Sequence, residues 1–365
     1  MKLKFVSQER SPRKSRGGGI KKLKVKSEKL KISEKNMIKK LKKLITEILI
    51  LALIGLMVGL NFWIPEVEAV TQATSSASVT NALPVASSVC VSDDGTGCTD
   101  TAINLTEATT KTVTVTFTVT DNNGCEDINS HATEDTRAVF YRTNVTEGAA
   151  CTAGNNDCYH IASSACTLSG CTTGGADLDA AFSCTVAVQF YADATDAGTY
   201  LATDWTVTAT PRDNEGTDGT TAADTIEMDT LTALNVDTTI AYGTLALGAN
   251  TGTTDQTTVV TNTGNNDPID IELNGYGAID EDGYSMICTI GTITIGQERY
   301  SLTASTNWAT KTQLTDTAAN VTTFNLAKGA SSTKDVYWGF GMPSTGVGGS
   351  CTGKVNFTAI TNINY

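Results

Sequence analysis

Beyond residue 110 the chain alternates apolar and polar positions with a period of two, which is typical of strands with one buried face. In Lys111–Thr120, which reads KTVTVTFTVT, Val113, Val115, Phe117 and Val119 share one side and threonines share the other. Four further segments follow the same rhythm: Cys184–Ala192, Ala202–Thr210, Lys334–Phe340 and Lys354–Ile360. Short strands at regular spacing predict an all-β fold built as sandwiches.

Turn-forming residues separate these segments, and no stretch after residue 69 carries a sustained apolar stripe of helical period. Asp121–Gly124, Asp213–Gly216 and Gly264–Pro268 are rich in Asp, Asn and Gly, which favour tight turns. Cysteine usage changes near residues 230–240, because eight cysteines precede this region and two follow it. We therefore expect two β-sandwich domains, the first disulfide-rich over residues 70–235 and the second over residues 236–365.

Residues 37–69 have the organisation of a secretory signal peptide. Lysines at 39, 40, 42 and 43 precede the uncharged apolar run Ile48–Leu60, and Val67–Ala69 places small residues at a cleavage site between Ala69 and Val70. The alternative is a retained anchor over Ile48–Ile64, which is short against the roughly 20 apolar residues of a spanning helix. The basic residues 1–36 are expected to be disordered, as an over-called start or an extended n-region.

The charge of the chain is divided at the same place. The formal charge is −13 overall, yet nine Lys or Arg stand against 33 Asp or Glu after Ala69, which gives −24. An acidic body outside and a basic segment inside agree with the positive-inside rule. Such a body repels nucleic acid and anionic lipid, so we expect neither as a partner. The membrane would be contacted only through an uncleaved N-terminal segment.

All ten cysteines follow the expected cleavage site, so the chain is predicted to be extracellular or on the cell surface with a disulfide framework. In the second half Cys288 has only Cys351 as a partner. In the first half short loops favour three pairs and leave one longer pair: Cys90–Cys98, Cys151–Cys158, Cys166–Cys171 and Cys125–Cys184. Zinc binding by Cys151, Cys158, Cys166 and Cys171 with His160 is disfavoured, because their spacing is not that of a zinc ribbon.

We find no catalytic motif around His131 and His160, which are the only histidines. We therefore expect no enzyme and no resident cofactor. Calcium is the one ligand with a physical case, because acidic turns between strands supply the oxygen atoms that hard cations prefer. The candidate ligands are Asp121, Asn123, Glu126 and Asp127 in one turn, Asp213, Glu215 and Asp218 in another, and Asp280, Glu281 and Asp282 in a third.

The second half resembles the immunoglobulin-like, Hydin-like sandwich modules of prokaryotic surface proteins. Ile240–Gly248 resembles the opening strand with its aromatic-Gly pair, and Val259–Asn265 resembles the strand followed by Asn-x-Gly. Trp338–Pro343 with Gly346–Phe357 resembles the last hairpin. The resemblance covers residues 236–365 and implies a non-catalytic spacer or an adhesive unit.

The first half resembles immunoglobulin-like domains at one motif. Asp196–Tyr200 reads DAGTY, as in a tyrosine corner, but Ala202 stands where that pattern has a cysteine.

From these observations we expect a secreted or surface protein with a structural or adhesive role, whose partners are other surface proteins or glycans. Three alternatives remain open: a carbohydrate-binding module, an enzyme of unknown type, and an anchored component of a surface assembly. The carbohydrate-binding module would use a platform of aromatic rings. Its candidate residues are Tyr191, Tyr200, Trp205, Trp308 and Trp338.

Overall fold

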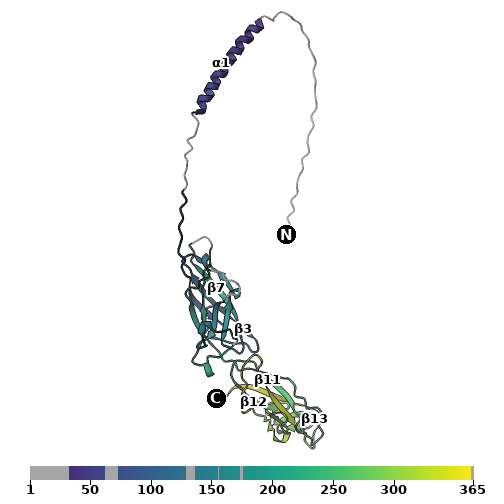
Figure 1. Cartoon of the computed structure of the whole chain (residues 1–365). Helices are drawn as coiled ribbons and strands as arrows, with labels where there is room; N and C mark the ends of the chain where they lie inside the picture. Colours follow the sequence, from purple (N-terminus) through teal and green to yellow (C-terminus); the bar gives the residue numbers. More distant parts are fainter. Residues whose placement is uncertain (1–32, 62–72, 129–135, 155, 173–175, 363–365) are drawn as a thin grey trace, which may run out of the picture. The chain divides into compact units, whose positions relative to one another are not determined.

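The computed structural model describes residues 33–61, 73–128, 136–154, 156–172 and 176–362. The chain divides into two units, residues 1–78 and residues 79–365. The described residues of the first unit include one helix, α1 (Ser33–Asn61), which contains the apolar run expected at Ile48–Leu60 (Figure 1). No helix in the described part of the chain is both long enough and apolar enough to span a membrane. The expected cut between Ala69 and Val70 and the basic residues 1–32 lie outside the described residues.

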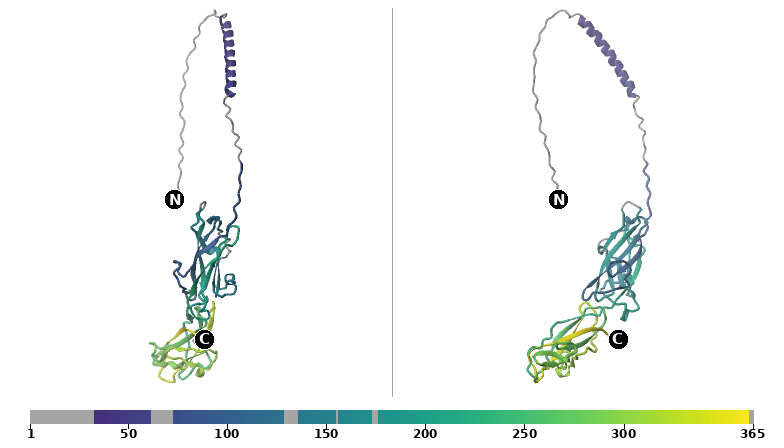
Figure 2. Two further views of the ribbon diagram at one scale, coloured as in Figure 1. Left: turned by 90° about the vertical axis from the view of Figure 1, so that its left-hand side faces the viewer. Right: turned by 180° about the vertical axis from the view of Figure 1, so that it is seen from behind.

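The second unit is all β, as the alternation predicted, with short 3-10 turns between strands (Figure 1). The turns are η1 (Cys125–Asp127), η2 (Gly148–Ala150), η3 (Ser163–Ala165), η4 (Gly198–Tyr200), η5 (Ile295–Gln297) and η6 (Trp308–Thr310). Figure 2 shows the same strands from two further sides.

Two sheets enclose the first core. One has the order β1-β3-β7-β6 and the other the order β2-β9-β8-β4-β5. Their strands are β1 (Val85–Ser92), β2 (Ala102–Ile103), β3 (Thr110–Thr120), β4 (Thr136–Arg142), β5 (Cys158–Ala162), β6 (Cys166–Ser169), β7 (Asp179–Gln189), β8 (Trp205–Ala209) and β9 (Ala222–Met228). All neighbours are antiparallel except β2 and β9. As expected, β3 turns its valines and Phe117 inward, where they share a core with Phe140 and Trp205 of the other sheet. The two sheets therefore form a sandwich.

Three sheets make up the rest of the unit, with the orders β10-β11-β18-β15-β16, β17-β12-β20 and β14-β13-β19. The first two enclose the second core, whereas Cys288 and Ile293 of the third sheet belong to a separate small cluster with Phe340. Their strands are β10 (Leu234–Val236), β11 (Gln256–Asn262), β12 (Ile269–Tyr276), β13 (Tyr284–Ile290), β14 (Thr292–Thr294), β15 (Glu298–Ser301), β16 (Thr312–Gln313), β17 (Ala319–Asn320), β18 (Thr333–Phe340), β19 (Gly348–Thr352) and β20 (Lys354–Thr361). Ile269, Ile271, Val336 and Trp338 are fully buried between them. These orders leave β10 and β20 at the ends of their sheets.

The five disulfides correct two of the expected pairings. Cys90–Cys98, Cys151–Cys158 and Cys288–Cys351 are paired as expected. The pairs Cys166–Cys171 and Cys125–Cys184 were wrong, since Cys166 is bonded to Cys184 and Cys125 to Cys171. Loop length alone suggested the first pair. The strand register decides otherwise, because β6 runs antiparallel to β7 and sets Cys166 directly opposite Cys184 with 3.9 Å between the Cα atoms.

Residues 263–266, which follow β11 and overlap the turn predicted at Gly264–Pro268, join the two cores. The main chain of Asn265 donates to Leu231 O at 3.0 Å, and its side chain accepts from Leu231 N at 2.6 Å. Thr263 O accepts from Ala108 N at 3.0 Å, and Thr263 Oγ1 donates to Glu107 at 2.7 Å. This segment therefore ties the connection before β10 and the loop before β3 to the second core.

A buried carboxylate adds a charged link between the two cores. Asp193, which follows β7, is 4% exposed and accepts from Arg142 Nε at 2.6 Å. Its other oxygen accepts from Nζ of Lys328, which lies in the segment between β17 and β18. Trp205 Nε1 donates to the main-chain oxygen of Asp193 at 2.7 Å. Two cations from different parts of the chain therefore compensate one buried anion.

Candidate functional site

A groove of about 500 Å³ opens between the segment that follows β10 and the strands β19 and β20. Residues 237–247 of that segment belong to no strand, although Ile240 and Tyr242 pack on the second core. A cavity of about 470 Å³ adjoins the groove, because both are lined by Ile240, Met286 and Cys351. The groove has a mixed lining, in which Val355 and Phe357 supply apolar surface and Lys354 supplies a charge.

Glu298 lines this groove while being only 2% exposed. Its Oε1 accepts a 2.7 Å hydrogen bond from the hydroxyl of Tyr242. Burial raises the pKa of Glu298 from 4.5 to about 7, against the smaller lowering effect of the Tyr242 hydrogen bond. Burial and the neighbouring Glu298 also raise the pKa of Tyr242 well above its ordinary value. The groove is therefore built over an acid that exchanges its proton near neutral pH.

Strand alternation explains how a glutamate reaches this position. In β15, which reads ERYS, Glu298 and Tyr300 point into the core and Arg299 and Ser301 point outward. Glu298 was not predicted as a site residue, because acidic residues in turns were the candidates and Glu298 lies in a strand. The sequence did carry one indication: Glu298 lies two positions before Tyr300, and residues two apart in a strand face the same side. A protonated carboxyl here can donate a hydrogen bond to a polar group in the groove, and a carboxylate can accept one.

The calcium candidates are divided by the structure. The turns of Asp121, Asp127 and Asp213 are neighbours, since Ile128 and Asp213 form a β-bridge, but among described residues these three carboxylates do not bring their ligand atoms within 4.8 Å of one another. Asp218 is instead held in an ion pair with Arg212 Nε at 2.7 Å, and Glu215 is exposed.

Other candidate ligands make hydrogen bonds within turns or between neighbouring segments. Asn123 Oδ1 accepts from Ala82 N at 2.5 Å, and Glu126 contributes its main-chain oxygen to Asn214. In the third turn Asp282 accepts four main-chain N–H groups, from Gly277, Ala278, Ile279 and Tyr284. Those donors, with Ala278 first, lower the pKa of Asp282 to about 2. Asp282 therefore organises its turn through hydrogen bonds.

The cysteine and histidine cluster weighed for zinc has no free thiol. Among described residues, one trio of His, Cys, Asp or Glu has all its ligand atoms within 4.8 Å of one another, and it comprises Cys151, Cys158 and His160. Both cysteines are in one disulfide, so neither can supply a thiolate. His160 Nε2 lies 2.8 Å from the main-chain oxygen of Cys151. His131 lies outside the described residues.

The five aromatic rings considered for carbohydrate binding are dispersed. Trp205, Trp338 and Tyr191 are buried, at 0%, 0% and 7% exposure. The other two are half-buried, and an arginine guanidinium covers a face of each. Arg142 lies 3.8 Å from the Tyr200 ring centroid, and Arg299 lies 4.1 Å from that of Trp308. These five residues therefore form no shared platform, because most of their ring faces are occupied by the protein itself.

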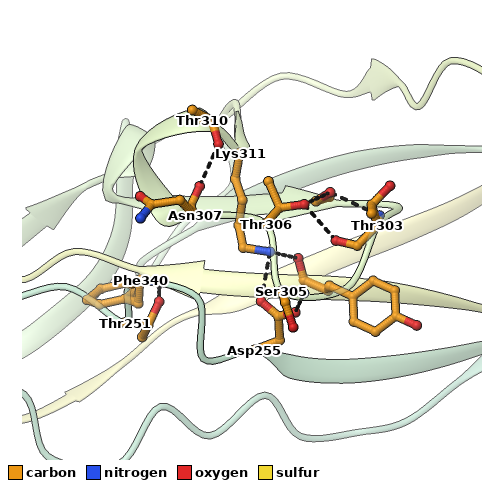
Figure 3. A network of polar contacts seen from close by, with 12 residues as sticks. Thr251, Asp255, Thr303, Ser305, Thr306, Asn307, Thr310, Lys311 and Phe340 are labelled. Carbon is orange, nitrogen blue, oxygen red and sulfur yellow. Dashed lines mark hydrogen bonds and ion pairs between the residues drawn. The ribbon is translucent and has the colours of Figure 1, made fainter.

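A fully buried lysine organises a loop of the second core (Figure 3). Lys311 Nζ lies 2.9 Å from Asp255 Oδ1 and donates to Tyr337 O at 3.1 Å. Asp255 Oδ2 accepts from Ser305 N at 2.6 Å, and Thr306 Oγ1 donates to Thr303 O in the same loop. The pair has further hydrogen bonds around it, as buried charges require. It fixes residues 303–311 against β11 and β18.

Comparison with known proteins assigns no family. No family model and no curated protein matches the chain. One similar solved structure is described as "Chaperone-tip adhesin complex is vital for synergistic activation of CFA/I fimbriae biogenesis". The match has 10% identity and a TM-score of 0.29, and it covers 76% of this chain and 85% of that chain. A TM-score this low carries no argument, so the function has to be inferred from the residues themselves.

Proposed function

We propose that this protein is secreted or displayed at the cell surface, where it has a structural or adhesive role without catalysis. The carrying observation is that all ten cysteines are paired in five disulfides. Disulfides form and persist in oxidising compartments and are rare in the cytosol. Every one of these cysteines follows the N-terminal segment that resembles a signal peptide.

Charge and architecture support the same proposal. The part of the chain after Ala69 has nine basic and 33 acidic residues, a formal charge of −24. This charge favours solubility and disfavours polyanionic partners. Two sheet-built cores joined by buried polar contacts suit a spacer or a display scaffold. On this proposal the partners are other surface proteins or glycans, and the helical segment is either removed or retained as an anchor.

The redox state of the native protein tests the proposal. Cells would be treated with a thiol-alkylating reagent before lysis, and the protein would be digested without reduction and examined by mass spectrometry. We expect no alkylated cysteine and five cross-linked pairs, with the protein accessible to protease on intact cells. A protein that is alkylated throughout and protected inside the cell would contradict the proposal.

Two further measurements separate the forms of the proposal. A mature chain that starts at Val70 would establish cleavage, whereas an intact helix would establish an anchored form. Binding of the full exported chain to arrays of glycans and surface proteins would show an adhesive role. Turnover of a substrate by the purified protein would instead support the enzyme alternative.

A further inference from the structure

Four Asn-x-Thr triplets occur in the sequence, and none has proline in the middle. They begin at Asn104, Asn144, Asn320 and Asn356. In exported proteins this triplet is the acceptor pattern for N-linked glycosylation, in which the side-chain amide of the asparagine receives a sugar. Such triplets also arise by chance in a chain rich in threonine, so their placement in the fold has to decide whether they are acceptors.

The structure orients all four triplets in the same way. The middle side chain of each is apolar and packs inward: Leu105 on the first core, Val145 on the small cluster of Val139, Cys151 and Cys158, and Val321 and Phe357 on the second core. The asparagine before it and the threonine after it are exposed in every triplet. Each triplet therefore presents an amide and a hydroxyl to the solvent, while the residue between them anchors the chain.

These exposed groups are not held by the protein. Among the described residues, the side-chain amides of the four asparagines and the hydroxyls of the four threonines take part in no hydrogen bond. Other asparagines differ, because Asn262 Nδ2 donates to Asn266 O at 3.0 Å and Asn274 Nδ2 donates to Asp280 Oδ1 at 2.8 Å. An amide of that kind would have to break its hydrogen bonds before reacting. The amides of the four triplets can react without that cost.

The backbone of each triplet is also accessible. The strands β2, β17 and β20 each lie at the end of a sheet. Asn104 directly follows β2, Asn320 is the last residue of β17, and Asn356 lies within β20. Asn144 lies in the turn that follows β4, with a φ of 71°. An enzyme can approach a turn or an end strand from the side, whereas a central strand has a neighbour on both edges.

We propose that Asn104, Asn144, Asn320 and Asn356 carry N-linked glycans, an inference that rests on the export proposed above. The co-substrate is an oligosaccharide linked through phosphate to a lipid. The amide nitrogen forms a bond to the anomeric carbon of the sugar, and the bond from that carbon to the phosphate oxygen breaks. The lipid phosphate leaves, and the amide gives up one proton to a base of the transferase. No oxidant or reductant is needed.

The two sites of the second core lie on one sheet. In the order β17-β12-β20, Glu272 of β12 is paired with Asn320 on one side and with Thr358 on the other. An open end strand is a template on which another chain can add a strand. Glycans on Asn320 and Asn356 would cover the outer face of this sheet and hinder such pairing along β20.

Peptide mapping of the native protein tests the proposal. The full exported chain would be isolated from the cells that make it, and its peptides would be fragmented by electron transfer, which leaves a sugar on the residue that carries it. We expect a sugar-containing mass on each of the four asparagines. Thr358→Val should remove the glycan from Asn356 and leave the other three sites modified. Thr358→Ser is the matched control, because it keeps the hydroxyl and should keep the glycan.

Thr106→Val and Thr106→Ser repeat this comparison at Asn104 in the first sandwich, in case the change in β20 prevents folding. Sugars on threonines beside four unmodified asparagines, or a Thr358→Val protein that keeps its glycan at Asn356, would overturn the inference. Four unmodified asparagines in an exported protein with all its disulfides formed would overturn it and leave the proposed function standing. A chain with alkylated thiols inside the cell would overturn the proposed function, and this inference with it.

Discussion

At the scale of single residues, Glu298 is the most unusual side chain of the second core. It is almost fully buried, it accepts a hydrogen bond from Tyr242, and it borders the groove. Buried carboxyl groups are neutralised or paired, because an isolated charge in a poorly solvated site is costly. The partner of Glu298 is the neutral hydroxyl of Tyr242, which brings no positive charge. Protonation of the Glu298 carboxyl therefore removes the cost of burying a negative charge.

Glu298 should make the stability of the second core depend on pH. Because burial raises its pKa from 4.5 to about 7, the folded protein holds an extra proton between these values. The free energy of unfolding should therefore fall as pH rises through this window, by about 3 kcal/mol, and level off above it. Urea unfolding of the wild type and of Glu298→Gln at pH 4.5, near pH 7 and above pH 7 would measure how their free energies of unfolding differ.

The glutamine variant isolates this effect, because it cannot titrate and can still accept from Tyr242. Its stability relative to the wild type should increase with pH over the same window. If the difference in the free energy of unfolding between the two proteins stays constant with pH, Glu298 does not change its protonation state within this window.

At the scale of elements, the sequence predicted the strands whose alternation is uninterrupted. The segment KTVTVTFTVT became β3, and the last two predicted segments became β18 and β20. The segment predicted at Cys184–Ala192 is part of β7, which begins at Asp179 and ends at Gln189. The first residues of β7 were not predicted, because Ala180 and Ala181 are both small and do not distinguish a buried face of the strand from an exposed one.

Long-range partners were beyond the sequence analysis. The partner of Cys166 depends on the register of β6 against β7, which loop length does not report. The acidic turns were recognised, but their meeting depends on the bridge between Ile128 and Asp213. Glu298 escaped prediction for a local reason, since its four-residue strand is too short to show a clear alternation of buried and exposed positions.

Two disulfides of the first core should differ in the stability that each contributes. Cys125–Cys171 closes a separation of 46 residues and Cys90–Cys98 one of 8. In the chain-entropy description these loops correspond to about 4 and about 2.5 kcal/mol. Replacing both cysteines of the longer pair by alanine should therefore destabilise the core more than the same change in the shorter pair. Hydrogen exchange of the β3 amides would measure the destabilisation in each variant. Equal destabilisation in the two variants would contradict the dependence on loop length.

At the scale of the whole molecule, hydrogen bonds of buried polar side chains connect the two cores. Asn265 makes three hydrogen bonds to the connection before β10, two with Leu231 and one with Asp229. A Cβ atom on Gly264 would lie 2.0 Å from Leu231 O, so the backbones approach closely there. Such contacts are directional, and they specify one arrangement of the connecting chain.

Asn265→Ala should loosen this connection while leaving both cores folded. The change leaves the amide of Leu231 without its acceptor, at a cost of about 2 kcal/mol for a buried donor. Limited proteolysis should cut residues 229–235 faster in the variant than in the wild type. Asn307→Ala is a suitable control, because Asn307 caps η6 with a comparable 3.0 Å hydrogen bond to Ala309. Equal cleavage of both variants would show that Asn265 does not secure the connection.

The disulfide map has a mechanical consequence for a chain that is pulled from its two ends. The overlapping bonds Cys125–Cys171 and Cys166–Cys184 exclude most of the intervening backbone from the load path, and Cys288–Cys351 excludes another long loop. Even with every strand separated, those loops cannot be drawn out straight, because the covalent cross-links carry the tension past them. Reducing agent would therefore lengthen the fully stretched molecule by the contour of the released loops.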